Sequence, residues 1–278
     1  MRSHRLRLTL PTLVLFVATL TAAAPAQSGK PAVVRPTQKL AALFSAHQAF
    51  SKPFIGSASL GVVPAWRPIT GERTVLPVLG QWTGADGLGW LHVSDGRRWL
   101  LVRLPGRPNG RTGWIKQRAT VASRTSWHIF VYTSSRRVIF YQWGRRVRVV
   151  KAVVGKPSTP TPRGKFFVEE VIQLRAADAG APFALALSAR SNVFQEFEGG
   201  PGQIALHGLR NIGGVLGSAV SHGCVRLSNS TMRWLVVRIS PGVPVTIKSR
   251  DGWTWFSSNW NGTKTIEQTL VGGNLSIH

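Results

Sequence analysis

The stretch Ser221-His222-Gly223-Cys224-Val225-Arg226-Leu227, read with Ile204-Ala205-Leu206-His207-Gly208 upstream, decides how this chain is interpreted. It contains the only cysteine among 278 residues. A single cysteine cannot form an intramolecular disulfide, so the thiol of Cys224 is packing material, an intermolecular link or a nucleophile. The flanking residues favour a nucleophile, because Gly223 lets a substrate carbonyl approach the backbone and two nearby histidines can accept the thiol proton.

These two stretches resemble the signature of the YkuD-type L,D-transpeptidases, bacterial enzymes that cross-link the cell wall. The similarity extends from about Trp127 to Lys248 and includes the proline-rich stretch from Gly155 to Gly164, which is also typical of the family. The resemblance implies a mainly β fold, in which a β-sandwich-like catalytic domain with one or two short helices occupies residues 126–249. It also implies a peptidoglycan stem tetrapeptide as the acyl donor.

The general base is expected to be His207, because it follows a short apolar strand pattern and matches the catalytic histidine of the family. No Asp or Glu occurs between Gly199 and Arg250, so a carbonyl or amide must orient this imidazole locally. The resemblance implies the backbone carbonyl of Gly208, while the more distant Glu196 remains an alternative. His222 has the same chemistry as His207 and is the second candidate for the base.

Backbone N–H groups of Gly223 and Cys224 are the predicted oxyanion hole, because glycine has no side chain to obstruct the approaching carbonyl. Ser221 and His222 are expected to contact the substrate. Arg226 either binds a substrate carboxylate or braces the loop around Cys224, and the lack of nearby acids favours the carboxylate.

Three arginines precede an apolar run from Leu8 to Leu20, and Ala24-Pro25-Ala26 then offers small residues for cleavage. This pattern predicts a secretory signal peptide at residues 1–26. The apolar run is shorter than the roughly 20 residues that span a bilayer, so we expect no stable membrane anchor after cleavage. The predicted location is the cell wall, outside the cytoplasmic membrane.

The chain is strongly basic, with 35 Lys and Arg against 10 Asp and Glu, a net charge of +25. Such a charge attracts polyanions. The basic residues are scattered through predicted strands without a nucleic-acid-binding motif, so anionic cell-wall polymers and carboxylate-rich peptides are the expected partners instead of nucleic acid. The family resemblance adds carbapenems as covalent inhibitors of Cys224.

Two segments are expected before the catalytic domain. Residues 27–69 contain five prolines and are predicted to be an extended linker, with an irregular strand on the next domain as the alternative. Residues 70–122 show short apolar runs separated by turns, which predicts a small β-barrel that resembles bacterial SH3-like domains. Its tryptophans are expected to pack in the core or, less readily, to bind a ligand; they are Trp82, Trp90, Trp99 and Trp114.

The catalytic domain is expected to open with a hairpin of Trp127–Tyr132 and Val138–Tyr141. The prolines of residues 157–162 exclude a central strand and predict a fixed loop. Arg175 to Gly180 is either a lid or a surface loop. Ser228 is expected to cap a helix from Asn229 to about Ile239, before a strand from Val243 to Ile247.

No cofactor is expected. A zinc site at His207, His222 and Cys224 lacks a nearby fourth ligand, so no metal is predicted. His128 is expected to be an ordinary strand residue and His47 a surface residue without a partner. The Trp-rich tail, residues 250–278, matches no motif.

Overall fold

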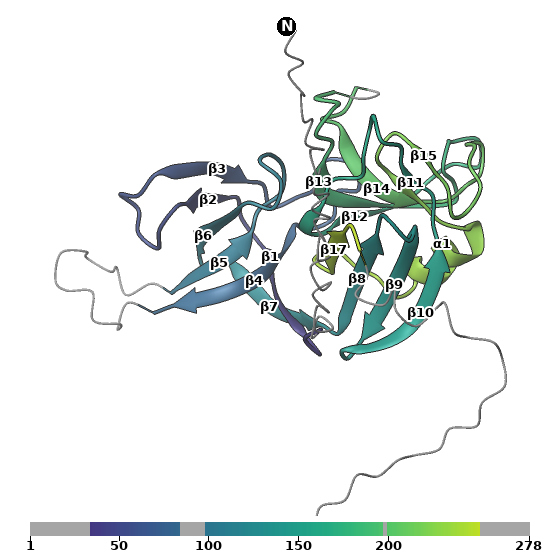
Figure 1. The fold of residues 1–278 in the computed structure, drawn as a ribbon. Helices are drawn as coiled ribbons and strands as arrows, with labels where there is room; N and C mark the ends of the chain where they lie inside the picture. Colours follow the sequence, from purple (N-terminus) through teal and green to yellow (C-terminus); the bar gives the residue numbers. More distant parts are fainter. Residues whose placement is uncertain (1–33, 84–97, 197–198, 251–278) are drawn as a thin grey trace, which may run out of the picture. The chain divides into compact units, whose positions relative to one another are not determined.

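The computed structural model of the chain describes residues 34–83, 98–196 and 199–250 (Figure 1). The predicted signal peptide, the strand proposed around Trp90 and nearly all of the Trp-rich tail lie outside these residues. Within the described ranges, no helix combines the length and the apolar character that a membrane crossing requires. The described chain is mainly β, as predicted, and its secondary structure consists of two large sheets, one two-stranded sheet and one helix.

The first sheet is built from seven strands that come before the catalytic region. They are β1 (Gln38–Leu43), β2 (His47–Phe50), β3 (Ser59–Val63), β4 (Val75–Trp82), β5 (Trp99–Arg103), β6 (Thr112–Lys116) and β7 (Thr120–Thr125). Every neighbouring pair is antiparallel, and the order is β3-β2-β6-β5-β4-β1-β7. The resemblance of this region to an SH3-like barrel stays a prediction.

The prediction of an extended linker over residues 27–69 is wrong for residues 38–63, which form β1, β2 and β3 of this sheet. The apolar stretch from Leu40 to Phe44 lies largely in β1, and β1 is bonded to β4 on one side and β7 on the other. Prolines in this region fall between strands, so they interrupt the chain without preventing sheet formation. The sheet therefore spans residues 38–125, a larger unit than the predicted 70–122.

The second sheet contains eight strands in the order β10-β9-β8-β17-β12-β13-β14-β16. The strands of the catalytic region are β8 (Trp127–Tyr132), β9 (Arg137–Gln142), β10 (Arg145–Lys151), β11 (Val154–Gly155), β12 (Gly164–Gln173), β13 (Phe183–Arg190), β14 (Gln203–His207), β15 (Ala219–Ser221), β16 (Val225–Arg226) and β17 (Pro244–Lys248). The β17–β8 and β14–β16 pairs are parallel, and β11 with β15 forms a separate parallel pair.

The expected hairpin is confirmed, because β8 and β9 pair from Trp127 opposite Gln142 to Tyr132 opposite Arg137. The next turn, between β9 and β10, places Trp143 at φ 53° and Gly144 at φ 75°. Two positive φ angles in a two-residue loop match the right-handed twist of the flanking strands. The proline-rich residues 157–162 form the predicted connection between β11 and β12.

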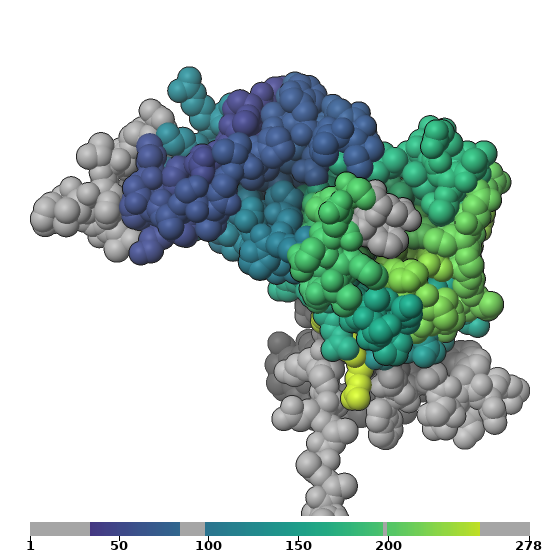
Figure 2. All heavy atoms as spheres, turned by 90° about the horizontal axis from the view of Figure 1, so that it is seen from above, coloured from purple at the N-terminus to yellow at the C-terminus, as the bar shows by residue number. Residues whose placement is uncertain are grey.

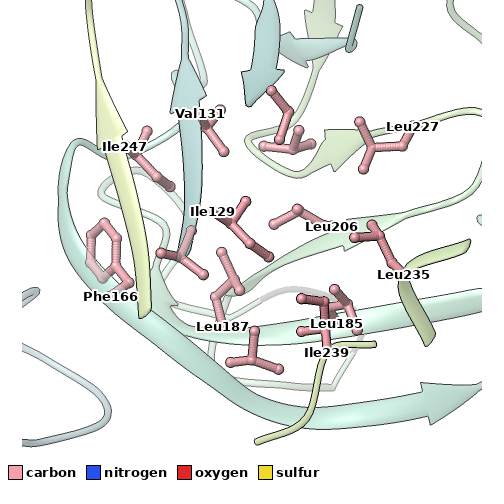
Figure 3. Packing of buried hydrophobic residues seen from close by; sticks show 14 of the residues in the cluster. Ile129, Val131, Phe166, Leu185, Leu187, Leu206, Leu227, Leu235, Ile239 and Ile247 are labelled. Atoms are coloured by element: carbon pink, nitrogen blue, oxygen red, sulfur yellow. The ribbon is translucent and has the colours of Figure 1, made fainter. Parts of the chain in front are cut away.

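Helix α1 (Asn229–Val236) begins as predicted, with the Ser228 hydroxyl accepting the N–H of Thr231 at 3.2 Å. It ends three residues earlier than expected. The buried side chains of Met232 and Leu235 join the large core of the catalytic region, which also contains Phe140, Leu187 and Leu206 (Figure 3). This core fixes the position of β14 and β16, the strands that carry the candidate site.

Strand β12 belongs to both hydrophobic cores, because successive side chains of a strand point to opposite faces. Phe166 and Val168 pack in the core of the catalytic region, whereas Phe167 packs with Leu43, Leu104 and other residues of the first sheet. In Figure 2 blue atoms of the first sheet's segment lie beside green atoms of the later strands. Through Phe167, β12 therefore packs against the core of the first sheet.

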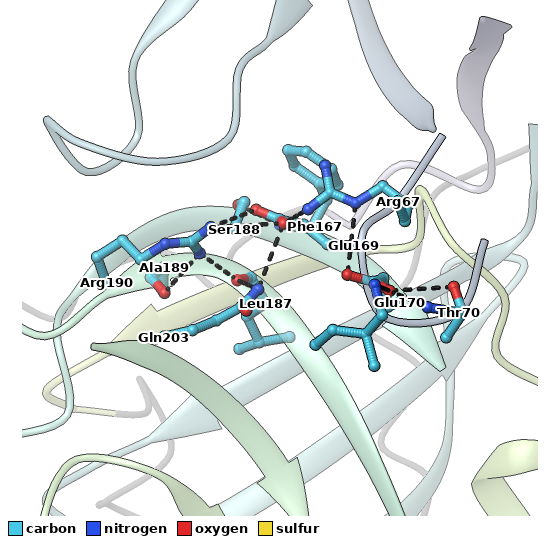
Figure 4. Close-up of polar contacts among 11 residues, drawn as sticks. Arg67, Thr70, Phe167, Glu169, Glu170, Leu187, Ser188, Ala189, Arg190 and Gln203 are labelled. Carbon is cyan, nitrogen blue, oxygen red and sulfur yellow. Dashed lines mark hydrogen bonds and ion pairs between the residues drawn. The ribbon is translucent and has the colours of Figure 1, made fainter. Parts of the chain in front are cut away.

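A buried polar network also joins the two sheets (Figure 4). Glu169 pairs with Arg67 from the first sheet's chain segment and with Arg190 at 3.3 Å, and Gln203 donates to it at 3.3 Å. Neighbouring Glu170 accepts the backbone N–H and the hydroxyl of Thr70 at 2.9 and 3.0 Å. A register shift between Val168 and Glu170 accompanies the burial of these two consecutive acids.

Candidate active site

The parallel pair of β14 and β16 brings the two signature stretches together. Leu206 is paired with Val225, and His207 with Arg226. Paired residues on parallel strands point to the same face, and the Leu206 and Val225 side chains lie in the core. His207 and Arg226 therefore face the opposite side, and the neighbours Ala205 and Cys224 meet there too, because the Ala205 N–H donates to the Cys224 Sγ at 3.4 Å.

His207 has the environment of a neutral base. It is 9% exposed, and its Nδ1 lies 2.9 Å from the backbone oxygen of Gly208. Burial lowers the pKa of His207 from 6.5 to about 4, helped by the charge of Arg226 and opposed by the Gly208 carbonyl. A carbonyl can only accept a hydrogen bond, so Nδ1 carries the proton and Nε2 has the free lone pair.

Glycine at position 208 is required by close packing around this carbonyl. A Cβ there would overlap the backbone oxygen of Ala181 and the Oδ1 of Asn229. Asn229 Oδ1 also accepts the N–H of Leu209 at 2.8 Å, which ties the start of α1 to the residues after His207. The Gly208 carbonyl is thus the neighbour of the imidazole, and the more distant Glu196 is not needed for this role.

Ser221 organises the turn that carries the thiol. Its hydroxyl donates to the Cys224 carbonyl at 2.6 Å and accepts the N–H of Gly223 at 3.1 Å. The expectation that the Gly223 N–H forms the oxyanion hole is wrong for this arrangement, because that N–H is already bonded inside the turn. Of the two backbone N–H groups predicted to form the oxyanion hole, only that of Cys224 remains our candidate. Ser221 is fully buried, so its role here is to shape the turn.

The proline-rich connection, residues 157–162, is hydrogen-bonded to this turn. The Thr161 hydroxyl donates to the Gly223 carbonyl at 2.8 Å, and the Thr159 hydroxyl donates to the Ser221 carbonyl at 3.1 Å. The N–H of Lys156 adds a bond to the same Ser221 carbonyl at 2.9 Å. Gly223 itself has φ 123°, a backbone angle that residues with a side chain rarely adopt. The stretch from Gly155 to Gly164 and the turn that carries Cys224 are therefore joined by hydrogen bonds and support each other.

Arg226 contacts the chain itself. Its Nη1 donates to the carbonyl of Gly213, in the connection between His207 and Cys224, and the side chain is largely buried. Burial lowers the pKa of Arg226, and a charge interaction with nearby Cys224 acts in the opposite direction. This contact supports the bracing interpretation of Arg226 and also places positive charge near the thiol, while a contact with a substrate carboxylate stays a prediction.

Residues 126–247 match the family model of YkuD, the L,D-transpeptidase catalytic domain. These residues are thus similar to an L,D-transpeptidase catalytic domain. A putative L,D-transpeptidase YkuD of Bacillus licheniformis is 32% identical over 124 residues, which are 44% of this chain and 65% of that protein. The match thus spans just under two thirds of the relative's length.

Solved structures of L,D-transpeptidases are also similar to parts of the chain. One from Mycobacterium smegmatis is 16% identical with a TM-score of 0.35, and the match covers 55% of this chain and 91% of that one. Another, solved in complex with imipenem, is 16% identical with a TM-score of 0.37, with the same coverage of 55% and 91%.

His222 is exposed, and its ring lies 6.0 Å from the ring of Phe194 at an angle of 63°. The segment around Gly223 is a turn, so the extended geometry that would place His222 and Cys224 on one face is absent from this described stretch. His207 has the better geometry for the base, and His222 is positioned on the outer side of the turn.

Two residues near the imidazole were missed by the sequence analysis. Gly180, at φ 87°, lies so close that a Cβ would overlap the Nδ1 of His207, and its carbonyl accepts the Gly208 N–H at 2.7 Å. Asn229 was expected only as the first residue of the helix. No local sequence pattern marks either position, because Gly180 approaches His207, and Asn229 approaches Gly208 and Leu209, through tertiary packing.

Other predicted residues lie away from the thiol. His128 is a strand residue as expected, with its Nε2 2.8 Å from the Thr246 hydroxyl and its pKa lowered to about 4 by burial and by Lys165 and Lys248. The expectation of an exposed His47 is wrong: it is buried, with ring nitrogens near the carbonyls of Ser45 and Arg118. Trp99 is buried against Phe50, which is core packing.

Within the described ranges, no group of three or more His, Cys, Asp or Glu side chains is arranged to hold a metal ion.

Proposed function

We propose that this protein is an exported cysteine L,D-transpeptidase that cross-links the cell wall. The observation that carries the proposal is the β14–β16 pair, which presents a neutral imidazole oriented by the Gly208 carbonyl on the same face as the Cys224 thiol. Nucleophilic acyl transfer needs such a thiol with a base beside it. The family match over residues 126–247 supplies the expected substrate class, a peptidoglycan stem tetrapeptide.

Acylation begins when Nε2 of His207 takes the proton of the Cys224 thiol. The sulfur attacks the carbonyl carbon that joins the diamino acid to the terminal D-alanine, and the N–H of Cys224 donates to the developing oxyanion. The intermediate collapses with cleavage of the C–N bond. The His207 imidazolium gives its proton to the leaving amine, so D-alanine departs and a thioester remains on Cys224.

Transfer repeats these steps in the opposite direction. An acceptor amine loses its proton to His207 as its nitrogen attacks the thioester carbon, and the Cys224 sulfur leaves. His207 then returns the proton to the sulfur, which restores the free enzyme. Water in place of the amine would give hydrolysis, the reaction of an L,D-carboxypeptidase.

Three further expectations belong to this proposal. The pattern at residues 1–26 supports export to the wall, and the net charge of +25 supports association with anionic wall polymers. A strained β-lactam carbonyl resembles the acyl group that Cys224 attacks, so carbapenems should acylate the thiol. The family resemblance and the half-buried position of Cys224 support this reaction.

The decisive experiment incubates the protein with a stem tetrapeptide, with and without an acceptor amine, and analyses protein and peptide by mass spectrometry. We expect a covalent acyl-enzyme, release of D-alanine and a cross-linked product that needs the amine. The matched variant is Cys224→Ala, which should melt at the same temperature and form no adduct. Hydrolysis alone would identify a carboxypeptidase, and peptide binding without turnover would identify a non-catalytic wall-binding protein.

A further inference from the structure

The connection between β13 and β14 is closed by its own backbone. The Ser191 N–H donates to the Gly202 carbonyl at 2.7 Å, so the two ends of the connection lie together. The Ser191 hydroxyl then accepts the N–H groups of Val193 and Phe194 at 3.2 and 3.0 Å. These bonds give the described start of the connection a defined turn.

Arg107, in the connection between β5 and β6 of the first sheet, is hydrogen-bonded to this segment. Its Nη2 donates to the carbonyls of Ser191 and Phe194, both at 2.8 Å, and its Nη1 donates to the carbonyl of Pro201 at 2.9 Å. One planar guanidinium therefore bridges the outgoing and returning ends of the connection. Hydrogen bonds from a charged donor are stronger than neutral ones, and three carbonyls need a fork that lysine lacks.

Asn109 pairs with the last residue of β13 in the same region. Its Oδ1 accepts the N–H of Arg190 at 2.8 Å, and its Nδ2 donates to the Arg190 carbonyl at 2.7 Å and to the side chain of Asn192 at 3.0 Å. The side-chain amide thus bonds as a neighbouring strand would. The guanidinium of Arg190 is in turn part of the buried network around Glu169, so the point of attachment is rigid.

Phe194 connects the held segment to the active site. Its carbonyl is bonded by Arg107, and its ring lies edge-on to the ring of His222, with the centroids 6.0 Å apart. His222 belongs to the turn that presents Cys224. The ring that contacts His222 therefore belongs to a segment that is bonded to Arg107 of the first sheet's chain segment.

We propose that Arg107 is a positioning residue of the L,D-transpeptidase site, which holds Phe194 against His222 and so fixes one wall of the groove that receives the peptide donor. The inference rests on the proposed function. Misplacement of a binding wall by about 1 Å can cost on the order of a hundredfold in rate, even when the reacting groups are untouched.

The test compares Arg107→Gln and Arg107→Lys with Arg124→Gln, which removes the same charge from an exposed position on β7 of the same sheet. Hydrogen exchange of the Val193 and Phe194 amides reports the anchoring directly. The rate of acylation by the tetrapeptide depends on how the groove binds the donor. Alkylation of Cys224 by iodoacetamide measures the reactivity of the thiol independently of donor binding.

We expect both Arg107 variants to speed amide exchange at Val193 and Phe194 and to lower kcat/KM for acylation by about tenfold or more. Alkylation by iodoacetamide should stay within about twofold, because a small reagent does not need the groove. The Phe194→Ala variant should show the same loss, and its combination with Arg107→Gln should cost less than the two losses together. Arg124→Gln should resemble the wild type in all three measurements.

Unchanged exchange in Arg107→Gln would overturn the anchoring. Faster exchange with unchanged acylation would overturn the link to the groove, and full recovery in Arg107→Lys would show that charge alone matters. If the wild type itself forms no acyl-enzyme, the proposed function fails instead, while amide exchange still decides whether Arg107 holds the connection.

Discussion

At the scale of single residues, the protonation state of His207 follows from burial. A buried imidazolium loses its hydration and here also faces the charge of Arg226, so the pKa falls from 6.5 to about 4. The Gly208 carbonyl fixes the proton on Nδ1. The resting site thus presents a neutral imidazole beside the Cys224 side chain.

This state predicts the pH dependence of acylation. A general base works in its neutral form, which exists above its pKa, so activity should persist well below pH 6.5 and be lost as the pH falls through about 4. The measurement is kcat/KM for acylation against pH, with thermal melting at each pH as the control for folding. An acid limb near 6.5 in a folded enzyme would contradict the neutral, buried His207.

The contributions of His207 and His222 to acylation can be distinguished by substitution. His207→Ala should slow acylation by about 10²–10⁴-fold, the usual contribution of a general base, whereas His222→Ala should cost clearly less. Single-turnover acylation followed by mass spectrometry measures both variants. If His222→Ala shows the larger loss, the roles that we assign to the two residues are reversed.

Arg226 can be tested by a double change. Arg226→Lys and amidation of the donor's side-chain carboxylate should each weaken acylation, and together they should cost less than the sum if both remove one contact. Kinetics with the two donors and the two enzymes provide the four rates required. Additive penalties would assign Arg226 to bracing the Gly213 carbonyl alone, the contact that is seen in the structure.

At the scale of elements, the turn of Cys224 depends on the connection between β11 and β12. Thr161 donates to the Gly223 carbonyl and accepts the Gly155 N–H at 2.9 Å, so one hydroxyl joins the two stretches. A Cβ at Gly155 would overlap the backbone of Thr159 and Thr161, which shows how tightly the connection folds on itself.

Thr161→Val keeps the shape of this side chain and removes both hydrogen bonds. Leaving buried backbone groups without partners costs about 1–3 kcal/mol in the free energy of unfolding, and acylation should fall because the turn loses its support. Denaturant unfolding and acylation rates check this, with the more exposed Thr133→Val as the control. Equal stability and rate in Thr161→Val would show that the connection does not support the turn.

At the scale of the whole molecule, β12 contributes side chains to both hydrophobic cores, and the ion pairs of Glu169 connect the two sheets. Arg67 and Arg190 are both buried beside this carboxylate, and burial lowers the pKa of each guanidinium. Two buried cations without their acid would be strongly unfavourable.

Glu169→Gln should therefore destabilise the protein by about 3–5 kcal/mol, the cost of breaking a buried pair. Guanidinium unfolding should show one transition in the wild type, because β12 packs in both hydrophobic cores and an ion network joins the sheets. The exposed Glu72→Gln serves as the control and should change little. A small effect at Glu169 would show that the network contributes little to joining the sheets.

The candidate site residues could be proposed from the sequence, because they belong to a local pattern. Cys224, His207 and Gly208 lie within two short stretches that resemble a family signature, and the alternation of apolar residues predicts the β8–β9 hairpin. The start of α1 was also predicted, because a serine cap is a local signal.

Only the tertiary structure decided the remainder. Residues 38–63 join the first sheet, the Gly223 N–H is taken by Ser221, and Gly180 and Arg107 act on segments far away in the chain. Each of these facts is a long-range contact between residues whose local sequence allows several structures. A sequence determines which groups can react, whereas packing determines which hydrogen-bond donors are already occupied and which residues hold them in place.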